Sequence, residues 1–485
     1  MPQTSSIAYA AQQMQFDVVA IGGGFAGLIA ANRCAQLGLR VAVLEKETAE
    51  RYLNNSRYTT GIAHILFQDM RLPGEKLLEV INQGTEGEAD PALAKAFADN
   101  SRRAIDWLVA EGGKYILVNA PTGKSIMLAP PRRFKQGLDW EGHGADYLLR
   151  KLESNLKNRG GRLIRGADAK ALAIADGACA GVEAVIGGKL ERLDARAVVI
   201  ADGGFSSNVE MIRRYITPRA DRLLIRSAAT AMGDGLRMAE AAGAQLCGFG
   251  AFYGHPVHRD AITCPADTML WPFPMIDPLT QAGLVVGPDG RRVADEGRGG
   301  IVLANLLAHL DDPLSTSLIF DDLTWTTIAR KGPAGNPMIL SAGATLHRAY
   351  KLAELATLAG VSPEGLTATI GEFNTTIAKG TAASLHPPRT MTPLAARPIL
   401  HPPFYALPLC SGITATMGGI AIDVDCRALR AGGSVIPGLF AAGSTVAGLE
   451  GGKQMAYMGG LSKAFILGLL AAEGVARASG KSART

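Results

Sequence analysis

The sequence predicts an α/β protein, and three observations support this prediction. The chain has 485 residues, of which 47% are hydrophobic and 19% charged, which is enough for two or three domains or for one large domain interrupted by another. A glycine-rich stretch near the N-terminus reads as a strand, a turn, a helix and a second strand. Segments of the same design recur near residues 200 and 440.

The N-terminal stretch, FDVVAIGGGFAGLIAANRCAQLGLRVAVLEK, is the clearest local pattern. Its apolar runs predict a buried strand over 16–21, a helix over 25–37 and a second strand over 41–44. Glu45 closes the second strand, where it would accept hydrogen bonds from ribose hydroxyls.

Three glycines of this stretch occupy the positions of GxGxxG. Gly22 permits the tight turn, Gly24 lets a pyrophosphate approach the backbone, and Gly27 allows close helix packing. The helix N-terminus would face the phosphates. Because the strand, helix, second strand and acid follow in order, the stretch predicts a Rossmann-like dinucleotide-binding unit, for either FAD or NAD.

Two later segments favour FAD. LDARAVVIADGGFSSNVEMIRRYI predicts a strand over 197–201, a glycine turn and a helix. GSVIPGLFAAGSTVAGLEGG predicts a turn, a strand through Phe440 and a further glycine turn. A ligand as long as FAD, extended across the sheet, accounts for three widely spaced glycine sites better than a single NAD half-site does.

Composition argues against several other functions. The net charge of +5 comes from basic residues scattered along the chain, so a nucleic-acid interface is not expected. The six cysteines lack CxxC spacing and suit reduced core thiols, which predicts a cytoplasmic protein. The N-terminus lacks a secretory-signal pattern, and the apolar run over 464–472 is too short to span a bilayer. His255 and His258 have no metal-ligand partner at suitable spacing, so no metal site is predicted.

Seven motifs in order carry a family resemblance: GGGFAG with Glu45, VVIADGGFSSN, MGDGLRMAEAAGA, the pair His255-Pro256, GRRVADE, TMGGIAID and IPGLFAAGS. The chain resembles the FAD-dependent family that includes fumarate reductase and succinate dehydrogenase flavoproteins and 3-ketosteroid dehydrogenases. This resemblance implies a noncontiguous Rossmann-like FAD-binding domain, residues 1–250 and 401–485, with an α+β capping domain inserted over 251–400. Substrate would lie between the cap and the flavin.

The resemblance also implies which residues bind FAD. They come from the glycine turns and from the loops that meet them, and they are Gly22, Gly24, Phe25, Ala26, Gly27, Glu45, Lys46, Ser56, Arg57, Thr60, Gly61, Ala169, Asp202, Gly203, Gly204, Asn208, Asp234, Gly443, Ser444, Gly459, Gly460 and Leu461. Succinate dehydrogenases attach FAD through a histidine near the segment matching NNSRYTTGI, where this chain has Asn54. FAD is therefore expected to bind non-covalently, with His64 as an alternative position for a link.

The resemblance also singles out three residues as candidates for catalysis. His255 matches the histidine that binds a substrate carboxylate in fumarate reductases, and Tyr253 is either its companion or a packing aromatic. Arg298 lies about two residues before the place of the arginine that delivers the proton, at Gly300. It would serve if the loop is shortened, and a solvated surface arginine is the alternative.

Two departures argue against a C4-dicarboxylate substrate. Ala415 stands where fumarate reductases have a histidine for the second carboxylate, and Tyr457 stands where they have an arginine. A phenol donates well to a ketone oxygen and replaces a bidentate arginine poorly. Tyr457 is therefore expected to donate to the substrate, with packing against the flavin edge as the alternative.

The sequence thus predicts an FAD-dependent dehydrogenase or desaturase that forms a C=C bond next to a carbonyl. The favoured substrate is a cyclic ketone such as a 3-ketosteroid or 4-oxocyclohexanecarboxylate, with an unknown electron acceptor. One alternative is a fumarate- or tricarballylate-type enzyme for polycarboxylates. Another is a flavin electron-transfer subunit, which would need a partner bearing haem or iron–sulfur, because the chain has no CxxCH and no cysteine cluster.

Overall fold

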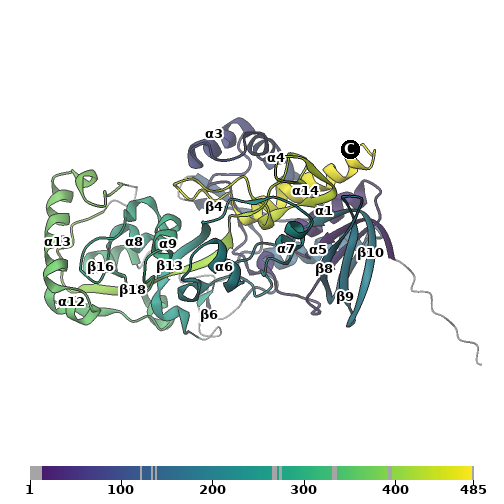
Figure 1. Cartoon of the computed structure of the whole chain (residues 1–485). Coiled ribbons are helices and arrows are strands. Elements are labelled where there is room, and N and C mark those ends of the chain that lie inside the picture. Colours follow the sequence, from purple (N-terminus) through teal and green to yellow (C-terminus); the bar gives the residue numbers. More distant parts are fainter. Residues whose placement is uncertain are drawn as a thin grey trace, which may run out of the picture.

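The computed structural model describes residues 14–120, 123–132, 135–136, 139–264, 270–271, 276–329, 336–391 and 396–482. Two large β-sheets organise an elongated molecule (Figure 1). An eight-stranded sheet lies at one end, and a six-stranded sheet extends toward the other end, where α12 (Leu352–Ala359) and α13 (Pro363–Ala378) lie. α13 forms from the stretch PEGLTATIGEFNTTIA.

The first sheet has the order β20-β21-β10-β1-β2-β7, and β9 pairs with both β10 and β8. Strands β7, β2, β1, β10 and β21 run parallel, so their carboxyl ends meet at one edge. The strands are β1 (Met14–Ile21), β2 (Val41–Glu45), β7 (Arg162–Arg165), β8 (Ala167–Ala175), β9 (Ala178–Ile186), β10 (Lys189–Ile200), β20 (Arg427–Leu429) and β21 (Val435–Ala441). The strands predicted at the three glycine segments are β1 and β2, the end of β10, and β21.

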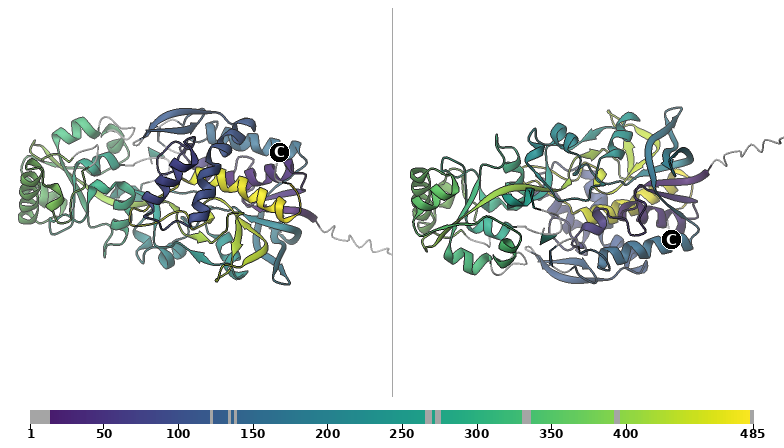
Figure 2. Two further views of the ribbon diagram at one scale, coloured as in Figure 1. Left: turned by 90° about the horizontal axis from the view of Figure 1, so that it is seen from above. Right: turned by 90° about the horizontal axis from the view of Figure 1, so that it is seen from below.

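Helices from the two ends of the chain cover this sheet together. α1 (Phe25–Gln36), close to its predicted bounds, packs against α14 (Gly460–Ala478), and the rings of Phe25 and Phe465 meet edge-on with centroids 5.3 Å apart. Figure 2 shows α14 beside α1 and α4 (Pro91–Ala110). The last helix of the chain therefore completes the layer that the first helix begins.

The second sheet is built around one long strand, β18 (Phe404–Thr416). Its order is β11-β18-β16-β15, and β13 and β17 also pair with β18. Its other strands are β11 (Leu224–Ile225), β13 (Phe252–His258), β15 (Leu284–Val286), β16 (Ser317–Asp321) and β17 (His347–Ala349). The division into two domains at residues 250 and 400 stays a prediction. β18 lies after residue 400, in the part assigned to the FAD-binding domain, but it pairs with β13 and β16 of the predicted cap.

Shorter elements connect and cover the sheets. The remaining α-helices are α2 (Asn55–Tyr58), α3 (Gly74–Gly84), α5 (Gly144–Asn158), α6 (Val209–Tyr215), α7 (Asp234–Ala241), α8 (Asp277–Ala282), α9 (Gly300–Ala308), α10 (Asp322–Thr324) and α11 (Asn336–Ser341). The remaining strands are β3 (Ile62–Ala63), β4 (Tyr115–Ala120), β5 (Gly123–Leu128), β6 (Lys135–Gln136), β12 (Leu246–Cys247), β14 (Leu270–Trp271) and β19 (Gly419–Ile420). Within the described ranges, no helix is both long and apolar enough to cross a membrane.

Candidate active site

Residues from both sheets line a cavity of about 940 Å³. Its wall includes the glycine turn after β1 at one end, and residues of β13, β18 and α8 at the other. Gly22 has φ +108°, and a Cβ at this position would lie 2.5 Å from the carbonyl oxygen of Ala201. Only glycine fits there, so the turn approaches the end of β10 as GxGxxG predicts.

Hydrogen bonds from nearby loops hold the glycine turn. The Gly23 N–H donates to Glu45 Oε2 at 3.0 Å, and the Phe25 N–H donates to Ser56 Oγ at 3.0 Å. The Tyr52 hydroxyl donates to the Gly23 carbonyl at 2.8 Å. Burial raises the pKa of Glu45, which lines the cavity as the predicted ribose ligand would.

Asp202 supplies a polar group that suits a dinucleotide. Its Oδ2 accepts from the Gly235 N–H at 2.7 Å, while its buried Oδ1 has no hydrogen-bond partner among the described residues. Burial raises the pKa of Asp202 to about 7. Because Asp202 lines the cavity, this orphaned oxygen fits a hydroxyl of a bound dinucleotide.

Most of the predicted FAD-binding residues line this cavity. They come from both ends of the chain, and they are Gly22, Gly24, Phe25, Ala26, Glu45, Lys46, Ser56, Thr60, Ala169, Asp202, Gly203, Asp234, Gly443, Ser444, Gly459, Gly460 and Leu461.

Five predicted FAD-binding residues are not in the cavity wall, and four of these have backbone or packing roles. A Cβ at Gly27 would lie 2.0 Å from the Gly22 carbonyl oxygen, which is the close helix packing expected of the third glycine. A Cβ at Gly204 would lie 2.1 Å from Thr416 Oγ1. Gly61 has φ +87°, and Asn208 caps α6 by accepting from the Met211 N–H.

Arg57 is the fifth, and its predicted contact with flavin or pyrophosphate is wrong. Its fully buried side chain forms ion pairs with Asp146 and Glu153, each at 3.0 Å, and donates to the Tyr52 carbonyl at 2.7 Å. The guanidinium therefore joins α2 to α5 outside the cavity, because two carboxylates of α5 compensate its charge.

At the other end of the cavity, three polar side chains form a connected line. His255 Nδ1 lies 2.9 Å from Asp277 Oδ1, and His255 Nε2 lies 3.0 Å from the Tyr253 hydroxyl. A carboxylate only accepts hydrogen bonds, so Nδ1 carries a proton, and in the neutral imidazole Nε2 then accepts from Tyr253. The predicted pair Tyr253 and His255 is thus brought together, and Asp277, the first residue of α8, joins it.

Tyr457 lies against this line. Its ring stacks on the ring of Tyr253, with centroids 3.8 Å apart and planes 9° from parallel. The Gly460 N–H, at the start of α14, donates to the Tyr457 hydroxyl at 2.6 Å. Burial raises the pKa of Tyr253 to about 12 and that of Tyr457 well above its ordinary value, so both phenols keep their protons near neutral pH.

Arg298 lines the cavity but is exposed, and its guanidinium donates to the Lys453 carbonyl and, at 3.4 Å, to Gln454 Oε1. It therefore connects the GRRVADE loop to the loop that precedes Tyr457. Sequence reasoning placed this arginine near the site without indicating this contact.

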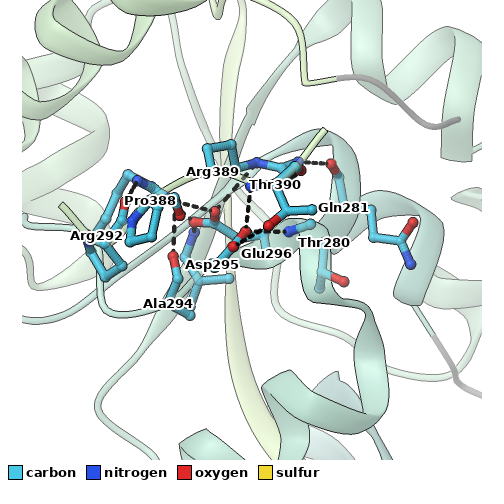
Figure 3. Close-up of polar contacts among 12 residues, drawn as sticks. Thr280, Gln281, Arg292, Ala294, Asp295, Glu296, Pro388, Arg389 and Thr390 are labelled. Carbon is cyan, nitrogen blue, oxygen red and sulfur yellow. Dashed lines mark hydrogen bonds and ion pairs between the residues drawn. The ribbon is translucent and has the colours of Figure 1, made fainter. Parts of the chain in front are cut away.

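A buried ionic cluster fixes that loop (Figure 3). Glu296 Oε2 pairs with Arg292 Nη2 at 2.6 Å and lies 3.5 Å from Arg389 Nε, and its Oε1 accepts from the Val285 N–H at 2.9 Å. Arg389 also donates to the Gln281 carbonyl at the end of α8. None of the three charged residues lines the cavity, so the cluster positions its wall.

Two residues bear on the mode of FAD attachment. Asn54 Nδ2 donates to the Gly23 carbonyl at 3.3 Å, beside the glycine turn. His64 lines the cavity with its Nδ1 accepting from the Phe67 N–H at 3.1 Å, and burial lowers its pKa to about 4. His64 is therefore neutral near pH 7.

Sequence reasoning missed Arg226 as a residue of the site. It directly follows β11 and lines the cavity with Thr414 and Ala415, and its Nη1 donates to Thr414 Oγ1 at 3.2 Å. No motif marks it, because only the pairing of β11 with β18 brings it there.

A family model described as an FAD binding domain matches residues 17–458. The chain belongs to this family. It is therefore a flavoprotein with FAD as its cofactor, and an oxidoreductase that acts on CH–CH groups. When bound, FAD supplies a ring that exchanges hydride with a substrate carbon.

Curated relatives of the chain act on different substrates. It is 26% identical over 488 residues to fumarate reductase (cytochrome) from Shewanella frigidimarina, covering 96% of this chain and 78% of the relative. It is 27% identical over 400 residues to NADH:acrylate oxidoreductase from Vibrio harveyi, covering 79% of this chain and 36% of that longer relative. It is 32% identical over 279 residues to 4-oxocyclohexanecarboxylate 2-dehydrogenase from Sinomonas cyclohexanicum, covering 52% and 46%.

Among solved structures, 3-ketosteroid Δ1-dehydrogenase from Sterolibacterium denitrificans has a TM-score of 0.76 at 19% identity, covering 96% of this chain and all of the other. This likeness shows that the fold is shared: a Rossmann-like FAD domain with a capping domain, as the sequence predicted.

Proposed function

We propose that this flavoenzyme forms, or in reverse reduces, a C=C bond next to a carbonyl, with a cyclic ketone as the favoured substrate. The observation that carries the proposal is the position of Tyr457, whose hydroxyl accepts from the Gly460 N–H inside the cavity and keeps its own proton. Such a phenol donates to a ketone oxygen and stabilises negative charge that develops there.

The line of Tyr253, His255 and Asp277 supports a proton path at the neighbouring carbon. In the dehydrogenation direction, Tyr253 passes its proton to His255 Nε2 and takes the proton released by the carbon next to the carbonyl. Asp277 stabilises the resulting imidazolium through Nδ1, at 2.9 Å. The substrate thus loses one proton to the protein, and FAD, when bound, would accept the hydride.

The environment of the glycine turn supports non-covalent FAD. Glu45, Ser56 and Asp202 would hold the cofactor by hydrogen bonds, and Asn54 stands where a covalent link would need a histidine. Denaturation in acid tests this point directly: the yellow colour should leave the protein, and colour that remains on the denatured chain would indicate a covalent link.

A polycarboxylate substrate is the second candidate, because Arg226 and Arg298 both line the cavity. This candidate is disfavoured because Ala415 and Tyr457 are neutral. Fumarate reductases have a histidine and an arginine at these two positions. A flavin electron-transfer subunit that binds no small substrate would not need a cavity that extends from the glycine turn to Tyr253 and His255.

Anaerobic mixing with a panel of reductants tests the proposal. The purified holoprotein is mixed with 4-oxocyclohexanecarboxylate, a 3-ketosteroid, succinate and tricarballylate, and loss of oxidised-flavin absorbance is followed. Bleaching by a cyclic ketone, with the unsaturated ketone as product, is expected. Bleaching by polycarboxylates alone would overturn the proposal in favour of the second candidate.

A further inference from the structure

Arg226 is a buried cation in the cavity wall that the proton path does not use. Its backbone N–H donates to the Ile413 carbonyl at 2.8 Å, and its Nη1 donates to Thr414 Oγ1 at 3.2 Å. Although it is only 4% exposed, it lines the cavity together with Tyr253 and His255. The junction of β11 and β18 therefore fixes a positive charge beside the residues proposed for catalysis.

The neighbouring strand leaves room for this side chain. A Cβ at Gly412 would lie 2.3 Å from Arg226 Cδ, so any larger residue would displace the arginine stem. Gly412 does not have positive φ, and its backbone conformation alone would accept other residues. The glycine thus preserves the position of the guanidinium against β18.

The charge balance of this end of the cavity indicates what the guanidinium binds. A guanidinium presents several N–H donors in one plane and pairs best with a carboxylate, through two parallel hydrogen bonds. Burial lowers the pKa of Arg226, while Tyr253 and Asp277 act in the opposite direction. Asp277 lines the same end, and its charge opposes a second negative group. One carboxylate suits this site better than a phosphate or a dicarboxylate.

We propose that Arg226 binds the single carboxylate of the substrate, so that the substrate class is a small oxo acid. Its ketone oxygen lies at Tyr457 and its carboxylate at Arg226. This inference rests on the proposed function and narrows it, because a neutral ketone would leave the buried guanidinium without a role in recognition.

Direct binding to the oxidised holoprotein tests the inference without turnover. Titration calorimetry with cyclohexanecarboxylate, 3-phenylpropanoate and propanoate is compared with the methyl ester of each acid. At least one acid should bind wild type more tightly than its ester, and Arg226→Met should weaken that acid roughly 10- to 100-fold without changing the ester. FAD content and unfolding temperature report on folding.

Two further variants keep the test decisive if Arg226→Met fails to fold. Arg226→Lys keeps the charge but loses the planar fork, and Gly412→Ala keeps the arginine but displaces its stem. Both should weaken the acid by less than Arg226→Met does. Arg213→Met removes an exposed arginine of α6 that is not part of the cavity wall, and this variant should bind the acid as wild type does.

The outcomes separate this inference from the proposed function. Equal affinity of the acid for wild type and the Arg226 variants, or no acid preferred over its ester, overturns the inference. Flavin bleaching by neutral cyclohexanone in that case leaves the proposed function standing. If the acid binds in an Arg226-dependent way but no ketone reduces the flavin, the proposed function is overturned, and Arg226 is shown only to bind an anion.

Discussion

At the scale of single residues, the chemistry depends on which groups hold protons inside the cavity. His255 lies between a carboxylate and a phenol, so its two nitrogens have different roles: Nδ1 donates to Asp277 and Nε2 accepts from Tyr253. Without the carboxylate, the neutral ring could adopt either tautomer, and only one of them has a free acceptor nitrogen facing Tyr253.

Asp277→Asn tests this arrangement. An amide can donate as well as accept, so the variant should lose the fixed tautomer and the stabilisation of the imidazolium. Flavin reduction by a ketone should slow roughly 10- to 100-fold in stopped-flow mixing, with FAD retained. Asp289→Asn, on an exposed turn, is the matched control, and an unchanged rate in Asp277→Asn would remove Asp277 from the proton path.

Asp202 gives a pH-dependent prediction for the apoprotein. Its pKa is about 7 in the folded chain against 3.8 ordinarily, so the folded state binds more protons between these values. Its contribution to stability is therefore present below the lower value and is lost as pH rises through the upper one. Asp202→Asn removes this loss. Its free energy of unfolding should therefore increase, relative to that of wild type, by at least about 1 kcal/mol as the pH rises from about 5 to about 8.

Thermal unfolding of both FAD-free proteins across this pH range measures the difference. The unfolding temperature of wild type should fall relative to that of the variant as the pH rises. A constant difference between the two proteins would mean that Asp202 does not titrate in this window.

At the scale of elements, buried ion pairs join segments that are distant in sequence. Arg57 connects α2 to α5 through Asp146 and Glu153, and the side chains of Arg57 and Asp146 are fully buried. Glu296 similarly connects the GRRVADE loop to Arg389 (Figure 3). Because removing one partner leaves an uncompensated buried charge, each pair makes its contact hard to break.

Arg57→Met should destabilise the protein by about 3–5 kcal/mol, because Asp146 would stay buried without its cation and Glu153 would keep only Arg165. The same change should leave the flavin absorbance spectrum of the folded holoprotein unaltered, since Arg57 is outside the cavity wall. Arg51→Met, at an exposed ion pair with Glu141, provides the comparison and should cost little. A shifted flavin spectrum at unchanged stability would restore the flavin contact expected from the sequence.

The elements also explain which features the sequence reveals. The β1–α1–β2 unit is local, so its strand, turn, helix and acid are legible in 31 consecutive letters, FDVVAIGGGFAGLIAANRCAQLGLRVAVLEK. Arg57 was misassigned because its partners lie 89 and 96 residues away on α5. Arg226 was missed because it enters the cavity only through the pairing of β11 with β18. Tyr457 lines the cavity, and the nearby Gly459 and Gly460, which mark the start of α14, are the local pattern that points to it.

At the scale of the whole molecule, β18 links the two ends of the cavity. It runs the length of the second sheet, carries Thr414 and Ala415 into the cavity wall, and is followed by β20 and β21, which return to the first sheet. The glycine turns at the edge of the first sheet therefore face the polar line of the second sheet. This arrangement puts the proposed flavin site and the proposed carbonyl site in one cavity, which is what hydride transfer requires.

The rate of flavin reduction by a cyclic ketone in Tyr457→Phe tests the central claim most directly. Single-turnover anaerobic mixing with 4-oxocyclohexanecarboxylate is compared in wild type, Tyr457→Phe and Tyr405→Phe, whose hydroxyl instead contacts Asp322 at 2.9 Å, outside the cavity wall. The account predicts a roughly 100-fold or greater loss in Tyr457→Phe alone, with FAD content unchanged. Equal rates in all three proteins would contradict the account, because the carbonyl oxygen would then be stabilised by another group.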